Sequence, residues 1–295
     1  MTLPPPPTVV ELKRICEQAG LRPNRGLGQN FMVSRSGLDA LVEAAGLNAD
    51  DVVLEPGPGP AGLTTLLAER AGHVIAVELD AGLYRLATER LAEADNVTLL
   101  HADILGPDGA LHPDVRDTLC DTLSGPSARF KLVSNLPYSA STAVIGAVLA
   151  AEPMPERLVV TVQKEVAERL TATPGGRDYG YFTMLVQAVS EVKTLKRLPP
   201  SAFWPQPEVE SAIVWISPRS ESARPEAAEL ARLQRLCSGI FTHRRKQISR
   251  ALVMSGFAAS RDEAEMHLAA VGVEPKRRPE SVEVIDLLRL ANRLS

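Results

Sequence analysis

From residue 51 onward the chain alternates apolar stretches with helix-like stretches, and this alternation limits its fold more than any other feature. Strands joined by helices form right-handed crossover units, and such units build a parallel sheet. The pattern therefore predicts an α/β fold with a doubly wound sheet. The predicted strands and the helices between the first of them cover residues 51–55, 63–72, 73–80, 81–94, 96–103, 130–136 and 157–163.

The character of the chain changes near residue 218. Two more strands are predicted at 191–198 and 211–217, followed by a linker at 218–227 that is rich in charged residues, Ser and Pro. Beyond it only helix patterns remain, at 226–241, 243–255, 260–270 and 281–293. We therefore divide the chain into an N-terminal tail and short helix (1–24), an α/β domain (25–217) and a small all-helical domain (218–295).

Composition excludes several classes of protein. Of the 295 residues, 45% are hydrophobic and 23% are charged, which is typical of a soluble globular chain. No run approaches about 18 apolar residues, and the proline-rich start lacks the basic and apolar parts of a secretion signal. The three cysteines are scattered, which favours reduced thiols over a disulfide or metal framework. We expect a cytoplasmic monomer with no metal and no membrane contact.

The charge is divided unevenly along the chain. Residues 219–295 contain 14 Lys and Arg against 10 Asp and Glu, a net of +4. The remainder contains 18 against 26, a net of −8. A basic segment attached to an acidic body is typical of a polyanion-binding part, although solvated surface charge explains the same numbers.

A glycine-proline turn follows the first predicted strand. Gly57 and Gly59 allow the backbone to approach a ligand, and the helix that follows points amide donors into the same space. Gly57, Gly59 and Gly62 have the dinucleotide spacing, but Pro58 and Pro60 remove donors that a pyrophosphate needs. The turn therefore indicates either a ligand site of another kind or a tight turn without a ligand.

Acidic residues end the next two strands. Glu78 lies 21 residues after Gly57, where a carboxylate can accept both hydroxyls of a ribose. Asp103 ends the following strand, where it suits the amino group of an adenine. Either acid alone can instead be a helix N-cap. The glycine turn weakens that alternative. A dehydrogenase requires the first acid but not a second acid one strand later followed by NLPY, a set that methyltransferases using S-adenosylmethionine have.

The segment Asn135-Leu136-Pro137-Tyr138 ends another apolar strand, at the sheet edge where ligands bind. The exocyclic amine of adenine is a poor nucleophile because its lone pair is delocalised. The Asn135 amide oxygen and the Leu136 carbonyl can accept its two hydrogens, Pro137 stiffens the turn, and Tyr138 offers a flat face for the base. We predict that alignment supplies most of the rate.

These motifs resemble one family. The chain contains, in this order, RGLGQNFM at 25–32, LEPGPGPAGLT at 54–64, VELD at 77–80, AD at 102–103, NLPYSAST at 135–142, VQKEVAERL at 162–170, PPSAFWPQPEVESAIV at 199–214 and FTHRRKQISRAL at 241–252. They are similar to the motifs of the ribosomal RNA small-subunit adenine dimethyltransferases (KsgA/RsmA type). The resemblance covers most of the chain.

The resemblance implies a Rossmann-like methyltransferase domain and dimethylation of two adjacent adenosines in the 3′-terminal hairpin of small-subunit rRNA, within a pre-ribosomal particle. It implies that Phe203 is a second stacking surface opposite Tyr138. It also implies cofactor contacts from Asn30, Met32, Gly57, Glu78, Asp103 and Asn135. The chain departs from the family where Pro56 replaces a branched apolar residue, where Ala61 replaces a frequent glycine, and at Met32, usually leucine.

The segment HRRK lies in a stretch where a helix over 233–252 is predicted. Its apolar stripe consists of Leu233, Leu236, Cys237, Ile240, Ile248, Ala251 and Leu252. At 100° per residue Arg244 falls inside the stripe and needs a carboxylate or carbonyl partner. We take the other basic residues as RNA-phosphate contacts or solvated charge: His243, Lys246 and Arg250 on the opposite face, Arg245 at its margin, and the second cluster at 276–278.

Three other functions remain open at this stage. A macrolide-resistance methyltransferase would act on a similar adenine in large-subunit rRNA, but the PPSAF segment and the basic helical tail favour the small-subunit enzyme. A non-catalytic assembly factor is disfavoured by the intact NLPY segment and both acids. A nicotinamide oxidoreductase is disfavoured by Pro58 and Pro60.

Overall fold

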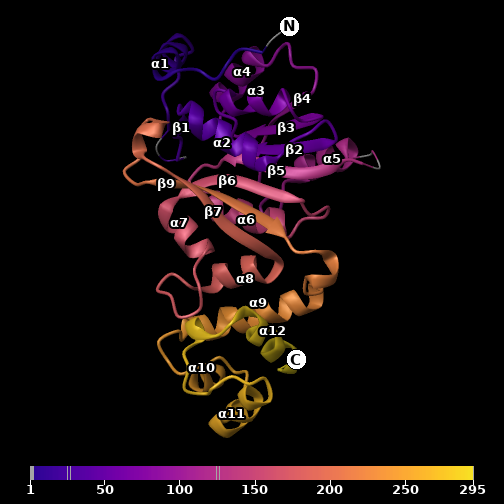
Figure 1. Ribbon diagram of the computed structural model, residues 1–295, viewed down its shortest axis with the longest axis vertical. Coiled ribbons are helices and arrows are strands. Elements are labelled where there is room, and N and C mark those ends of the chain that lie inside the picture. Colours follow the sequence, from indigo (N-terminus) through magenta and orange to yellow (C-terminus); the bar gives the residue numbers. More distant parts are fainter. Residues whose placement is uncertain (1–2, 25, 27, 124, 126, 295) are drawn as a thin grey trace. The chain divides into compact units, whose positions relative to one another are not determined.

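The computed structural model describes residues 3–24, 26, 28–123, 125 and 127–294 (Figure 1). The chain forms two compact units, residues up to Ala167 with 193–218, and residues 168–192 with 219 to the C-terminus. The second unit therefore takes in 168–192, which the sequence analysis assigned to the α/β domain. The reason is local packing, because Cys237 on the first helix of the C-terminal part contacts Met184, with the sulfur atoms 3.7 Å apart.

The first unit is built on a mixed sheet with the strand order β4-β3-β2-β5-β6-β9-β7. The strands from β4 to β6 are parallel, as predicted, and β9 is antiparallel to β6. Because helices cover the sheet, β2 is buried along its whole length, and its apolar residues Val52, Val53 and Leu54 are consecutive rather than alternating. The strand bounds are β2 Asp51–Pro56, β3 His73–Glu78, β4 Val97–His101, β5 Arg129–Asn135, β6 Arg157–Gln163, β7 Ser190–Leu198 and β9 Ser211–Pro218.

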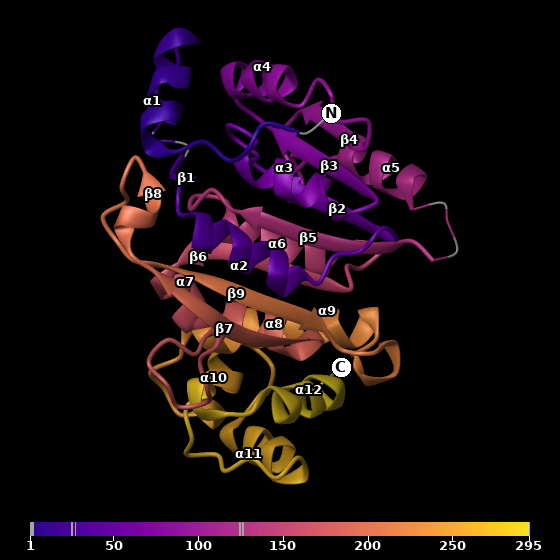
Figure 2. The ribbon, with the colours of Figure 1, turned by 45° about the horizontal axis from the view of Figure 1, so that its top comes forward.

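Helices connect these strands, and Figure 2 shows α2 alongside β5 and β6, on which it packs. The α/β class is thus as predicted, although the sequence analysis did not predict α6 and α7. The helix bounds are α1 Val9–Gln18, α2 Arg35–Ala45, α3 Gly62–Ala68, α4 Ala81–Arg90, α5 Pro113–Thr122, α6 Ser141–Leu149 and α7 Lys164–Leu170, the last spanning the boundary between the units.

A two-stranded sheet joins two motifs that are far apart in sequence. β1 (Phe31–Met32) runs antiparallel to β8 (Phe203–Trp204), with Phe31 opposite Trp204 and Met32 opposite Phe203. The amides of Val33 and Ser34 both donate to the Ala202 carbonyl, at 2.9 and 3.1 Å. The QNFM and PPSAFW segments are therefore fixed to each other through backbone atoms.

The proline-rich start is packed against the first unit. Pro7 is buried, and Arg90 on α4 donates to the Pro5 carbonyl at 3.0 Å. Thr8 then begins α1 with a capping box, in which its hydroxyl and the Glu11 carboxylate satisfy each other's backbone amides. The described tail is thus extended, as expected, but held by the domain.

The second unit is helical. It contains α8 Tyr181–Val189, α9 Ala227–Thr242, α10 Ile248–Met254, α11 Arg261–Ala270 and α12 Val284–Arg293. Its core includes Leu233, Leu236 and Ile240 of α9, which form the stripe expected from the sequence. Within the described ranges, no helix is both long and apolar enough to span a bilayer.

A buried ion pair stabilises the amino-terminal edge of the sheet. Asp51 opens β2 with 0% of its surface exposed, and its carboxylate lies 2.9 Å from the Lys131 ammonium on β5. The same ammonium donates to the Gly46 carbonyl, at the C-terminus of α2, at 2.9 Å. Lys131 thus neutralises a buried acid and donates to a carbonyl at the C-terminus of a helix.

We expect Lys131→Met to lower the free energy of unfolding by about 3–5 kcal/mol, because it leaves the Asp51 charge buried without its main partner. Urea denaturation measures this change. The matched control is Arg116→Met, which breaks the exposed pair with Asp117 and should shift stability by no more than about 0.5 kcal/mol. Equal losses in the two variants would contradict the structural role of the buried pair.

Candidate active site

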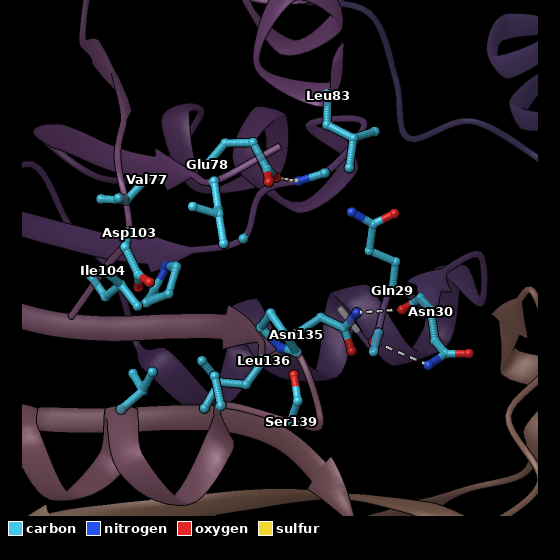
Figure 3. Close-up of a pocket in the computed structure, with 18 of the residues that line it drawn as sticks. Gln29, Asn30, Val77, Glu78, Leu83, Asp103, Ile104, Asn135, Leu136 and Ser139 are labelled. Carbon is cyan, nitrogen blue, oxygen red and sulfur yellow. Dashed lines mark hydrogen bonds between the residues drawn. The ribbon is translucent and has the colours of Figure 1, made fainter. Parts of the chain in front are cut away.

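A cavity of about 260 Å³ in the first unit lies beyond the carboxyl ends of β2, β3, β4 and β5 (Figure 3). The strand order reverses between β2 and β5, and such switch points are where doubly wound sheets bind ligands. Of the residues predicted from sequence, the cavity brings together Asn30, Gly57, Glu78, Asp103, Asn135, Leu136 and Pro137.

The glycine turn forms one wall of this cavity. Gly57 and Gly59 have φ angles of +69° and +54°. A Cβ on Gly57 would lie 3.2 Å from the Pro137 ring, and one on Gly59 would lie 2.9 Å from the Phe31 ring. Both positions thus require glycine, for conformation and for space.

Ala61 ends the same turn in the left-handed region, at φ +58°. This conformation explains the frequent glycine at this position in the family that the sequence resembles. An alanine there stores strain of about 1 kcal/mol, which the surrounding buried structure must hold. Alanine in place of glycine at position 61 therefore lowers the stability of the turn without changing its backbone conformation.

Glu78 links this turn to β3. One carboxylate oxygen accepts the Gly59 amide at 3.0 Å and the other accepts the Asp80 amide at 2.9 Å. Burial raises the pKa of Glu78, because the side chain is only 5% exposed. The N-cap of α4 is Asp80, so Glu78 is not a capping residue, and it lines the cavity.

Asp103 lies across the cavity from the glycine turn, past the end of β4. It is exposed, and one of its oxygens accepts the Leu105 amide at 3.0 Å. The next helix, α5, is capped by His112, so Asp103 is not an N-cap either. Its second oxygen is available to a ligand beside the buried Ile104.

Asn135 is oriented by the backbone of another segment. Its side-chain nitrogen donates to the Asn30 carbonyl at 2.9 Å, as Figure 3 shows. A carbonyl only accepts, so this bond fixes which end of the amide is nitrogen. The amide oxygen is buried and has no hydrogen-bond partner among the described residues. Asn135 therefore presents a desolvated acceptor.

A second cavity of about 440 Å³ adjoins the first. The two share Gly28, Gln29, Asn30 and Ser139, and Tyr138 lines only the second. The Tyr138 hydroxyl hydrogen-bonds the Ser211 hydroxyl at 2.5 Å, which fixes the ring. The NLPY turn thus contributes to both compartments, which adjoin at Gly28, Gln29, Asn30 and Ser139.

Phe203 and Met32 are placed differently from the expectation. Phe203 is 1% exposed and meets Tyr138 edge-on, with ring centroids 6.5 Å apart and planes at 71°. The rings therefore form a T-shaped pair, and not a parallel slot for a base. Met32 is buried in the core and lines a separate, much smaller cavity instead of the first one. Pairing of β1 with β8 turns both side chains inward.

Sequence reasoning missed most of the apolar lining of the first cavity. Phe31, Leu79, Leu83 and Ile104 belong to it. The one usable signal was position, because Leu79 and Ile104 each directly follow a predicted acidic ligand. No group of three or more potential metal ligands occurs in the described part of the chain.

The basic segment of the second unit is a turn and not a helix. α9 ends at Thr242 and α10 begins at Ile248, because the Ile248 amide donates to the Arg277 carbonyl at 2.7 Å. The prediction of a continuous helix and of a partly buried Arg244 was therefore wrong. Arg244 is exposed, although it has the expected carbonyl partner, Arg177, at 3.2 Å.

This turn brings the two basic clusters of the second unit together, 243–250 and 276–278. Among the described residues, Arg245, Lys246, Arg250 and Lys276 are exposed and have no carboxylate partner within ion-pair distance. His243 is half-buried. Cations that lack acidic neighbours are suited to phosphate contacts.

The chain resembles known proteins in sequence and in structure. It is 35% identical to a ribosomal RNA small subunit methyltransferase A of Pediococcus pentosaceus, over 96% of this chain and 93% of that one. It is 38% identical to a probable ribosomal RNA small subunit methyltransferase A of Methanopyrus kandleri, over 83% and 82%. The solved 23S rRNA methyltransferase ErmE is 28% identical with a TM-score of 0.67, over 90% of this chain and 99% of that one.

A dimethyladenosine transferase from Plasmodium falciparum is 21% identical with a TM-score of 0.71, over 88% of this chain and 95% of that one, and it supports the fold. The family model described as ribosomal RNA adenine dimethylase matches residues 20–295. Together with the relatives at 35% and 38% identity, this match over nearly the whole chain shows that the protein belongs to the ribosomal RNA adenine dimethylase family.

Proposed function

We propose that the protein transfers methyl groups from S-adenosylmethionine to the N6 amines of two adjacent adenosines in the 3′-terminal hairpin of small-subunit rRNA. The observation that carries the proposal is the orientation of Asn135. Its buried oxygen has no partner, and Asn135 lines the first cavity while its amide nitrogen is bonded to Asn30, which lines both cavities. One compartment can therefore hold a methyl donor and the adjoining one a target base.

The residues of the first cavity fit the cofactor. Glu78 keeps free lone pairs for two ribose hydroxyls, and Asp103 keeps one oxygen for an amine. The apolar side chains of Leu79, Leu83 and Ile104 provide surfaces for an adenine ring. The cavity volume of about 260 Å³ is near the lower end of ligand pockets. When bound, the cofactor supplies an electrophilic methyl group.

The chain's own contribution is alignment. The Asn135 oxygen accepts one hydrogen of the target amine, and the Leu136 carbonyl accepts the other. These two bonds hold the nitrogen nearer to tetrahedral and aim its lone pair toward the first cavity. Because Asn135 is already oriented by Asn30, little reorganisation is needed at the moment of reaction.

Tyr138 supplies the stacking face for the flipped adenosine from the wall of the second cavity. Its hydroxyl is bonded to Ser211, so the ring plane is set before the base arrives. Phe203 supports this ring edge-on from the buried side.

The relatives favour small-subunit rRNA over the alternatives. Those named small-subunit methyltransferases reach 35% and 38% identity, against 28% for the large-subunit enzyme. A non-catalytic assembly factor has no need for Glu78, Asp103 and Asn135 around one cavity. The proposal includes a pre-ribosomal particle as the bound form, a cytoplasmic monomer as the working form, and RNA contacts from His243, Arg245, Lys246 and Arg250.

A direct test incubates the purified protein with labelled S-adenosylmethionine and with under-methylated small or large subunits. Label in N6,N6-dimethyladenosine from the 3′-terminal hairpin of small-subunit rRNA supports the proposal. Label only in large-subunit rRNA supports a methyltransferase of the macrolide-resistance type, and no label in either rRNA supports a non-catalytic role.

Glu78→Ala should weaken cofactor binding by about 1.5–3 kcal/mol, because it removes a charged acceptor for the ribose. Calorimetry measures the affinity, and circular dichroism checks that the variant is folded. Glu89→Ala on the outward part of α4 is the matched control and should bind normally. Unchanged affinity in a folded Glu78 variant would refute the ribose contact.

Asn135→Ala should slow methyl transfer by about 100–1,000-fold and leave cofactor binding largely intact, because the lost acceptor acts mainly in the transition state. Single-turnover methylation at saturating cofactor measures this. Tyr138→Phe should be mild and Tyr138→Ala should lose about 1–3 kcal/mol of stacking. Near wild-type transfer by Asn135→Ala would mean that the NLPY segment is only a structural turn.

Changing Lys246 and Arg250 to Ala together should weaken RNA binding. The slope of the logarithm of the binding constant against the logarithm of salt concentration should become shallower by roughly 0.7–0.9 per lost phosphate contact. The control pair, Arg261→Ala with Arg289→Ala, removes exposed cations of the same unit that are already neutralised by Glu265 and Asp286. Binding isotherms across a salt series distinguish them. Identical slopes for the two double variants would show that the unpaired cluster is merely solvated.

A further inference from the structure

A third, much smaller cavity lies behind the wall of the main one. It measures about 30 Å³, which leaves room for about one water molecule. It shares Phe31, Gly57 and Asn135 with the main cavity, so these residues separate the two spaces. Its other lining residues are Pro7, Met32, Leu38, Glu55, Pro58, Pro60, Gly62 and Leu63.

Glu55 is the only titratable side chain in this described lining. It is 1% exposed, and its Oε2 atom has no hydrogen-bond partner in the described part of the chain. The Asn135 oxygen on the same cavity is also unpartnered. Two acceptors on one buried cavity are unfavourable if Glu55 is ionised, so either Glu55 carries a hydrogen or a donor lies between the two.

The charges around Glu55 favour its neutral form. Glu78 on β3 acts on it as a like charge, and the hydroxyl of Thr64 on α3 opposes this effect. The residues that α2, β1, β5 and the N-terminal segment contribute to the cavity lining carry no charge. Burial is the largest cause of the shift in the pKa of Glu55, which is raised to about 8.

We propose that Glu55 responds to the charge of the bound ligand: it holds a proton while no cation is present and releases that proton to solvent when the sulfonium cofactor binds. This inference rests on the proposed function. A cation on the far side of Gly57 and Asn135 favours a carboxylate in the low-dielectric space behind them. The Glu55 carboxylate then offsets the sulfonium charge from behind the wall of the main cavity, whereas Glu78 and Asp103 line the cavity itself.

The proposal gives Glu55 a role in exchanging substrate for product. Methyl transfer removes the sulfonium charge, so Glu55 takes its proton back from solvent. The electrostatic attraction between Glu55 and the bound ligand is then lost. An enzyme that adds two methyl groups to each of two adenosines must exchange cofactor repeatedly. Glu55 therefore selects S-adenosylmethionine over S-adenosylhomocysteine without touching either one.

Titration calorimetry in two buffers of different ionisation enthalpy tests this directly. The wild-type protein at pH 7 should release nearly one proton per S-adenosylmethionine and clearly fewer per S-adenosylhomocysteine. The two ligands share ribose and amino groups, so their difference isolates the sulfonium. From pH 6 to 8 the affinity ratio should move toward S-adenosylmethionine by up to about tenfold per pH unit.

Glu55→Gln should abolish this pH dependence and release equal numbers of protons with both ligands. Glu69→Gln, an exposed acid at the end of α3, should behave like wild type. Equal proton release for the two ligands in the wild-type protein overturns the inference, even if Glu55→Gln does not fold. If neither ligand binds the wild-type protein, the proposed function fails and this inference fails with it.

Discussion

The separation of β2 from β5 beyond Leu54 and Leu132 creates the space on which the whole site depends. The two strands pair in register up to these residues, whereas β2 continues to pair with β3 as far as Pro56. In the gap, the Ser134 hydroxyl donates to the Pro56 carbonyl at 2.6 Å, and Pro137 packs against Gly57. A sheet without this reversal in strand order would have no room for a ligand here.

The same gap explains why unusual residues gather in one place. Buried acids, left-handed backbone and an unpartnered amide oxygen each cost free energy in an ordinary core. Glu55, Ala61 and Asn135 all lie within a few residues of the end of β2 or β5. The well-packed remainder of the sheet, anchored by the Asp51–Lys131 pair at its other edge, keeps them in position.

Sequence predicted the polar part of the site and missed its apolar part. Glu78, Asp103 and Asn135 were identified because chemistry and strand-end position agree at each of them. Phe31 and Leu83 give no such signal, since in the sequence an apolar residue that lines a cavity cannot be distinguished from one in the core. The break at 243–247 was also missed, because the Arg277 carbonyl that receives the Ile248 amide comes from a distant segment. Periodicity along one helix contains no information about such a partner.

The bond from Asn135 to Asn30 has an evolutionary consequence. Its acceptor is a backbone carbonyl, so no substitution at position 30 can remove it by chemistry alone. Its position depends instead on the register of β1 against β8, which is set by Phe31 opposite Trp204. The short segment from Gly28 to Ser34 is therefore expected to accept changes of residue far more readily than changes of length. Inserting or deleting one residue there would move the Asn30 carbonyl away and leave the Asn135 side-chain amide free to flip.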